Sequence, residues 1–199
     1  MATPGTERSP ARLHDAHMRV FVLLLTVLFA NTCSHAPQPV AVEPRAVDGV
    51  AAFRTRLQAE LKEAMARGPE HAITVCRDRA PRIAAESGAE TLQLGRSSLR
   101  LRNPANAPAA WVEEVLESYA SHPEDRSPRT VALPDGRSGY AEPIVVQPLC
   151  LVCHGETVAP AVQKKLAELY PHDRATGYRQ GDFRGVFWAV TAGTSSRRP

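Results

Sequence analysis

The segment GYAEPIVVQPLCLVCHG occupies residues 139–155 and joins a predicted strand to a reactive motif. Residues 139–146 predict the strand, and Pro143, which lacks a backbone N–H, indicates an edge position or a bulge within it. A C-x-x-C-H run at residues 150–154 follows directly. We therefore expect the chemistry of this chain to lie just beyond the end of one strand.

Two amphipathic helices are expected on the N-terminal side of this segment, over residues 48–68 and 70–87. Apolar residues from Val50 to Met65 recur every three or four positions in the first helix. In the second helix, Cys76 falls on the apolar face.

The remaining segments alternate between strand and helix patterns. The order helix–helix–strand–helix–strand–helix–strand favours a single α+β domain with an antiparallel sheet. The 199 residues allow one such domain and a leader. The expected elements are a strand at 91–102, a turn at 103–106, a helix at 109–121, a polar loop at 122–137, a helix at 160–169 and a strand at 183–190.

An uncharged apolar run at residues 20–30 precedes the domain. It is shorter than the roughly 20 residues that a transmembrane helix needs, and it is typical of the apolar core of a signal peptide. Met18 offers a compact alternative start for this signal. The expected organisation is a leader at 1–36, a proline-rich linker at 37–47, one folded domain at 48–190 and a tail at 191–199.

Cys33 stands near the end of the leader, where two kinds of processing are open. Ala30 to Cys33 resembles a lipoprotein signal, in which the cysteine is lipidated and anchors the chain to a membrane. Ser34-His35-Ala36 instead fits an ordinary signal-peptidase site. Both kinds of processing place the domain outside the cytoplasm, in the periplasm or cell envelope.

The charge distribution argues against a nucleic-acid partner. The formal net charge is +3, and the 24 lysines and arginines are spread along the chain without a dense basic block. Proteins that bind nucleic acids concentrate such charges on one face. The hydrophobic content of 43% is that of an ordinary globular protein.

The C-x-x-C-H run predicts covalent attachment of one c-type haem. The thiols of Cys150 and Cys153 have the spacing to add to the two vinyl groups of a haem, and His154 then supplies its imidazole to the iron. This attachment takes place outside the cytoplasm, which agrees with the leader. A thioredoxin-like pair needs a βαβ setting, and a zinc site needs further ligands at suitable spacing; the sequence pattern supplies neither.

The residue pattern alone does not identify the second axial ligand of the iron. Cys76 stands out because it is a lone thiol in an oxidising compartment, where unpaired thiols are uncommon. A buried cysteine is also an ordinary small apolar residue, and histidine and methionine are the commoner ligands in cytochromes. The candidates are Cys76, Met65, His71, His122 and His172.

Arg96, Arg100 and Arg102 cluster in one predicted strand, the last two on the same face. Guanidinium groups bind carboxylates in a bidentate manner, so the cluster favours contact with the haem propionates. For each arginine taken alone, a position on a solvent-exposed strand face is about as good an explanation as contact with a propionate.

Four segments of the chain resemble a bacterial domain-of-unknown-function family of c-type haem proteins, found alone and as the extracytoplasmic sensor part of signalling kinases. The resemblance covers most of residues 50–190 and implies a PAS-like antiparallel sheet flanked by helices. It also implies that Cys76 serves as the distal axial ligand opposite His154. The segments are AITVCRDRAP (72–81), GRSSLRLRNPANAPAAW (95–111), GYAEPIVVQPLCLVCHG (139–155) and YPHDRATGYRQGDFRGVFW (170–188).

Two functions agree with these expectations. A haem with two protein ligands has no open site for a substrate, which indicates a one-electron carrier that serves a redox partner protein; a thiolate ligand would lower its potential. The alternative is a periplasmic redox or gas sensor that acts through a separate partner. No distal acid–base residue for a peroxidase is identified, so an enzyme is not expected. A disulfide oxidoreductase would use Cys150 and Cys153 without haem.

Overall fold

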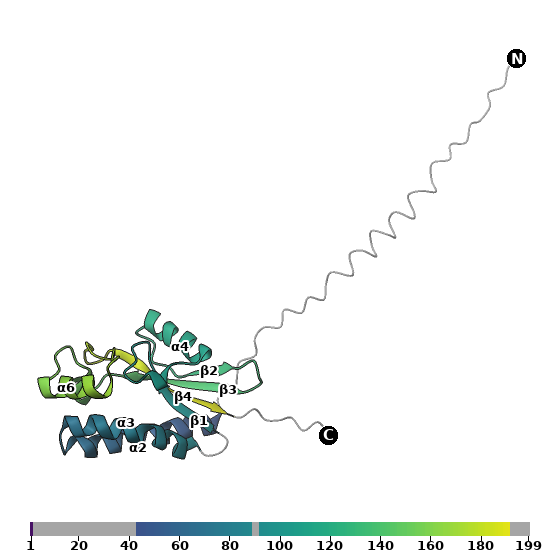
Figure 1. The fold of residues 1–199 in the computed structure, drawn as a ribbon. Coiled ribbons are helices and arrows are strands. Elements are labelled where there is room, and N and C mark those ends of the chain that lie inside the picture. The colour runs from purple at the N-terminus through teal and green to yellow at the C-terminus, as the bar shows by residue number, and fades with distance from the viewer. Residues whose placement is uncertain (2–42, 89–91, 192–199) are drawn as a thin grey trace. The chain divides into compact units, whose positions relative to one another are not determined.

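The computed structural model describes residue 1, residues 43–88 and residues 92–191 (Figure 1). The leader, Cys33 and the tail from residue 192 lie outside the described residues, as does most of the expected linker. Within the described part of the chain, no helix is long and apolar enough to cross a membrane.

Two long helices form the first layer. α2 spans Pro44–Met65 and α3 spans Pro69–Gly88, and the two pack against each other. α2 begins four residues before the expected position, inside the predicted linker, because a proline fits the first turn of a helix, where its missing N–H has no partner to lose. The helix α3 continues through Pro81.

Four strands form one antiparallel sheet, which confirms the predicted α+β class. Their order in the sheet is β1-β4-β3-β2, so the last strand of the chain lies inside the sheet. Antiparallel pairing holds for all three neighbouring pairs. The strands are β1 Leu92–Ser97, β2 Arg129–Ala132, β3 Ser138–Val145 and β4 Phe183–Thr191.

The sheet has a hydrophobic core on each face. α2 and α3 cover one face, and α4 (Ala110–Ser121) covers the other (Figure 1). Tyr140 and Ala141 are neighbours in β3, yet Tyr140 packs with Phe53 beneath α2 while Ala141 packs with Leu116 of α4. This follows from the alternation of side chains along a strand. The fold is therefore a layer of helices on each side of one sheet.

The strand predicted at 91–102 ends at Ser97, which corrects the expected placement of two arginines. The Ser98 hydroxyl accepts a hydrogen bond from the Arg100 backbone N–H at 3.0 Å, and this local turn takes the chain out of the sheet. Pairing with β4 accordingly stops at Ser97. Arg100 and Arg102 therefore do not share a strand face, and they point into different surroundings.

β2 is a strand within the predicted loop at 122–137. It is four residues long, lies at the edge of the sheet and is bounded by Pro128 and Pro134, so it carries no readable alternation of apolar residues. Its pairing with β3 ends at Ala141, which leaves Pro143 with a neighbouring strand on one side only. The register of β3 with β4 then shifts between Ile144 and Val145, so the expectation of an edge or bulge at Pro143 is confirmed locally.

Candidate functional site

The C-x-x-C-H run forms a helical turn directly after β3. A 3-10 turn, η3, spans Pro148–Cys150, and the short helix α5 spans Leu151–His154. Residues three and four positions apart in a helix face the same side, so the turn places Cys150 and Cys153 on one side. All three described thiols, those of Cys76, Cys150 and Cys153, are free.

The two motif thiols are anchored in different surroundings. Cys153 packs beside a small core that α6 (Pro160–Leu169) forms with Ile73 of α3. Cys150 packs beside Val146 and Tyr178, and its sulfur accepts a hydrogen bond from the Gln147 backbone N–H at 3.3 Å. The motif is thus tied both to α3 and to the segment that precedes β4.

One ring nitrogen of His154 is fixed by the backbone. Nδ1 lies 2.6 Å from the Ala175 carbonyl oxygen, and because a carbonyl can only accept, Nδ1 is the donor and carries the proton. The lone pair then resides on Nε2, whose polar neighbour is an Arg102 nitrogen at 3.5 Å, too long for a strong hydrogen bond. Burial, and secondly the positive charge of Arg102, lower the pKa of His154 well below 6.5. The imidazole is therefore neutral at pH 7, the form that binds metals.

Residues 173–178 form a loop that holds the motif in place, and we call it the 173–178 loop. Backbone N–H groups of Gly177 and Tyr178 donate to the carbonyls of Gly155 and His154 at 2.9 and 3.0 Å. The Tyr178 ring stands edge-on to the His154 ring, with 6.4 Å between their centroids. These contacts fix the imidazole from the backbone side and from the ring side.

A mostly buried ion pair links this loop to the segment after β1. Arg102 Nε donates to an Asp173 carboxylate oxygen at 2.9 Å, and the two side chains are only 13% and 10% exposed. The other Asp173 oxygen accepts from the Ala175 backbone N–H at 2.8 Å, and Arg102 also donates to the Cys153 carbonyl. Asp173 therefore sets the orientation of Ala175, whose carbonyl holds His154.

A cavity of about 480 Å³, here called the Cys76 cavity, lies between α3, β1 and residues 103–107. Cys76 is half-buried in its wall, and burial raises the pKa of its thiol while Arg96 and Arg102 partly oppose that rise. The Arg96 guanidinium lines the same cavity and makes no hydrogen bond or ion pair with any described residue. Burial lowers the pKa of Arg96. The cavity thus combines a thiol with an unpaired cation.

Arg100 lies away from the Cys76 cavity. Its guanidinium donates to the Arg174 and Thr176 carbonyls and stacks on the Tyr178 ring at 4.3 Å. Of the predicted arginines, the structure therefore brings Arg96 and Arg102 close to the site cysteines and places Arg100 behind the 173–178 loop. Met65, His71, His122 and His172 do not line the Cys76 cavity, and neither do the motif residues Cys150, Cys153 and His154.

Two alternative uses of the cysteines find no support in this geometry. Every pairing of the four described strands is antiparallel, so the motif does not sit in the βαβ unit of a thioredoxin-like protein. Among the described residues, no group of three or more His, Cys, Asp or Glu side chains is arranged to hold a metal ion by itself.

Comparison with known proteins gives the relationship. A model of the Tll0287-like family matches residues 39–191. The chain belongs to the Tll0287-like family. A solved structure, described as the crystal structure of the cyanobacterial heme-protein Tll0287, is 26% identical in sequence, with a TM-score of 0.56. The match covers 79% of this chain and 100% of that chain. No curated protein matches.

Membership of the Tll0287-like family confirms the resemblance drawn from the four sequence segments, and with it the PAS-like fold. Sequence reasoning missed Asp173 and Ala175, which fix the motif histidine. The available signal was that both lie in the segment YPHDRATGYRQGDFRGVFW (170–188), one of the four that carry the resemblance to this family.

Proposed function

We propose that this chain is an exported protein that carries one covalent haem c and acts as a one-electron redox carrier. Cys150 and Cys153 would hold the haem by thioether bonds, and His154 and Cys76 would be its axial ligands. The Tll0287 relative is described as a heme-protein, which supports haem binding by this member of the family.

The observation that carries the proposal is the state of His154. Its Nδ1–H is committed to the Ala175 carbonyl, which leaves the Nε2 lone pair for a metal. A hydrogen bond on the far ring nitrogen is the usual support of a metal-binding histidine, because it fixes both tautomer and ring orientation. The adjacent helical turn carries two free thiols.

The residues of the Cys76 cavity also fit a haem. A thiol and an unpaired guanidinium line a space of about 480 Å³, within the usual range of cofactor pockets. Arg96 offers a partner for a propionate carboxylate, and Arg102 lies close enough to influence the charge of both Cys76 and Cys153. Arg100 is committed to backbone carbonyls, so we assign it no more than an outer role.

A bound haem iron supplies one-electron chemistry. The protein's part would be to occupy both axial positions, which leaves no place for a substrate, and to set the potential. Cys76 would bind as the thiolate, and electron donation from sulfur favours the oxidised iron. The unpaired charge of Arg96 acts in the opposite direction.

The test is to produce the full chain in a host that matures c-type cytochromes. We expect a denatured mass that exceeds that of the processed polypeptide by one haem, and a reversible titration with a one-electron slope and a midpoint below that of His/Met cytochromes. Colourless protein with the mass of the bare chain would overturn the proposal, and so would a titration that is not reversible.

Sensing is a second candidate, favoured by one observation. The Cys76 thiol makes no hydrogen bond with any described residue, so little besides the iron would hold it in place. Displacement of such a ligand by nitric oxide or carbon monoxide would report a gas to a partner protein. A spectral change on adding either gas to the reduced protein would favour this reading, and an unchanged spectrum would favour the carrier.

Export is the part of the proposal that rests on the sequence alone. The apolar run at 20–30 and the motif's need for extracytoplasmic maturation support a periplasmic or cell-envelope location. Whether Cys33 is lipidated would distinguish a membrane-anchored protein from a simply secreted one. Intact-mass measurement of the mature chain distinguishes a lipidated Cys33 N-terminus from a chain that begins after Ala36.

A further inference from the structure

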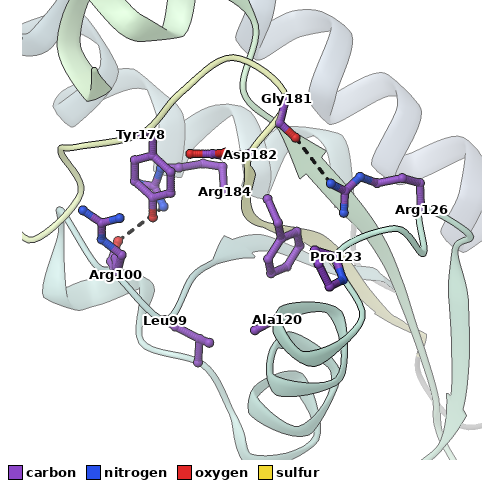
Figure 2. Close-up of a pocket in the computed structure, with 10 residues that line it drawn as sticks. Leu99, Arg100, Ala120, Pro123, Arg126, Tyr178, Gly181, Asp182 and Arg184 are labelled. Carbon is purple, nitrogen blue, oxygen red and sulfur yellow. Dashed lines mark hydrogen bonds between the residues drawn. The ribbon is translucent and has the colours of Figure 1, made fainter. Parts of the chain in front are cut away.

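A second cavity, here called the Arg126 cavity, has a volume of about 370 Å³. The end of α4, the residues around Leu99 and the stretch 178–184 form its walls. Figure 2 shows Arg126 on one side of the cavity, with Tyr178 and Arg184 on the other. None of the described cysteines lines it, and it shares no lining residue with the Cys76 cavity.

The walls of this cavity carry an excess of positive charge. Arg100, Arg126 and Arg184 line it, and none of them forms an ion pair with a described carboxylate. Asp182 is the only carboxylate in the lining, and one of its oxygens accepts from the Arg179 backbone N–H at 2.7 Å. Three guanidinium groups around one carboxylate leave a net positive site.

Two of these guanidinium groups retain donors for a ligand. Arg184 Nη1 donates to the Ser98 hydroxyl at 2.6 Å and to the Arg100 carbonyl at 3.3 Å, while its other nitrogens have no described partner. Arg126 makes only long contacts, at 3.3 and 3.4 Å, to the carbonyls of Gly181 and Asp125. A guanidinium has five N–H donors, so both can bind a carboxylate.

The remainder of the lining is apolar or aromatic. Leu99, Pro123 and Phe183 contribute to the walls, and Leu99 is 37% exposed, unusual among the large apolar side chains of the described chain. The Tyr178 ring closes one side beneath the Arg100 and Arg184 guanidinium groups, which lie 4.3 and 5.2 Å from its centroid. A purely inorganic anion would leave this apolar surface uncovered.

We propose that the Arg126 cavity binds a small organic carboxylate with an apolar body. Its carboxylate contacts Arg126 and Arg184, and its apolar part covers Leu99 and Phe183. This inference does not depend on haem. Because Tyr178 contacts both this cavity and the His154 ring, an occupant touches the residue that packs against the motif histidine.

The test is calorimetric titration of the purified full-length chain with benzoate and, separately, with inorganic phosphate. We expect saturable benzoate binding with a Kd of about 1 mM or tighter and no phosphate binding in the same range. Arg126→Gln is expected to weaken benzoate binding at least about tenfold, a loss of roughly 1.4 kcal/mol. Arg137→Gln, the same charge change on the distant β2–β3 hairpin, is the matched control and is expected to bind normally.

A second variant allows the test to be made even if Arg126→Gln does not fold. Ala120→Asp, on the last turn of α4, places a negative charge inside the cavity and is expected to abolish benzoate binding while the thermal midpoint is retained. No benzoate binding by the unaltered protein, equal binding of phosphate, or normal benzoate binding by both Arg126→Gln and Ala120→Asp would each overturn the proposal.

Discussion

The His154 side of the site is fixed by hydrogen bonds, whereas the Cys76 side is defined by burial alone. On the first side, the 173–178 loop binds the motif through two backbone bonds and the Ala175–His154 contact, and the Arg102–Asp173 pair holds that loop. On the second side, the Cys76 thiol and the Arg96 guanidinium make no hydrogen bond with any described residue.

The two sides of the site position their ligand side chains in different ways. A ligand that is oriented by several hydrogen bonds is preorganised, so binding a metal costs it little ordering. A ligand that is held by packing alone is placed approximately and gains its geometry when the cofactor arrives. Under the proposed function, the His154 side would define where the haem attaches, and the Cys76 side would adjust its redox potential.

The largest expected effect comes from replacing both motif thiols. Cys150→Ser combined with Cys153→Ser is expected to abolish covalent haem, because no thioether can form, and the intact mass of the denatured protein measures this. Cys76→Ser removes the remaining described thiol and is the matched control, expected to keep the full haem mass. Covalent haem on the double variant would contradict the division between the two sides.

Breaking the ion pair behind His154 is expected to cost the fold about 3 kcal/mol. Asp173→Asn leaves the mostly buried Arg102 charged but without its carboxylate partner. An uncompensated buried charge lowers the free energy of unfolding more than replacement of the whole pair would. Urea unfolding of the haem-free chain measures the loss. Asp135→Asn makes the same change on the exposed β2–β3 hairpin and is expected to leave the midpoint unchanged. Equal shifts in the two variants would remove the special role of Asp173.

Removing Cys76 is expected to change the iron without releasing the haem. Cys76→Ala takes away the thiolate, so the ferric absorption spectrum should change and the midpoint potential should rise. Thr74→Ala, on the same helix, is the control and is expected to keep both. An unchanged spectrum in Cys76→Ala would exclude this thiol as an axial ligand.

The pH dependence of the haem-free chain is expected to report on His154. Its pKa is lowered in the folded state by burial and by Arg102, so its neutral form stabilises the fold, fully above the unfolded pKa of about 6.5. This contribution is lost as the pH falls from there toward the folded pKa, by at most about 1.4 kcal/mol per pH unit. Urea unfolding at pH 7.5 and 5.5 should show a smaller loss for His154→Gln, and equal losses would contradict the assignment.

The smallest effect is expected at Arg96. Because its guanidinium has no described partner and burial disfavours its charge, Arg96→Gln is expected not to destabilise the haem-free chain. In the haem-bound protein it removes a positive charge near the iron, so the midpoint potential should fall, as a redox titration can measure. Arg67→Gln at the exposed end of α2 is the control. An unchanged potential in Arg96→Gln would place Arg96 away from the haem.

Local patterns in the sequence predicted most of the fold. Sequence patterns located α2, α3, α4 and α6 and three of the four strands. The predictions failed where a local signal was weak or was overruled. β2 is too short to show a period, and the alternation from Leu92 to Arg102 continues past Ser97, although the Ser98 turn ends the strand there.

The chemistry that we propose for the motif comes from the sequence, because Cys150, Cys153 and His154 are neighbours in the chain and their spacing alone predicts haem attachment. The tertiary contacts, in contrast, establish which ring nitrogen of His154 keeps its lone pair available and which arginine lies near Cys76. Those choices depend on contacts between segments more than 20 positions apart, such as His154 with Ala175 or Arg102 with Asp173. Local sequence patterns do not predict such contacts, because the contacts form only when folding of the sheet brings its connecting loops together.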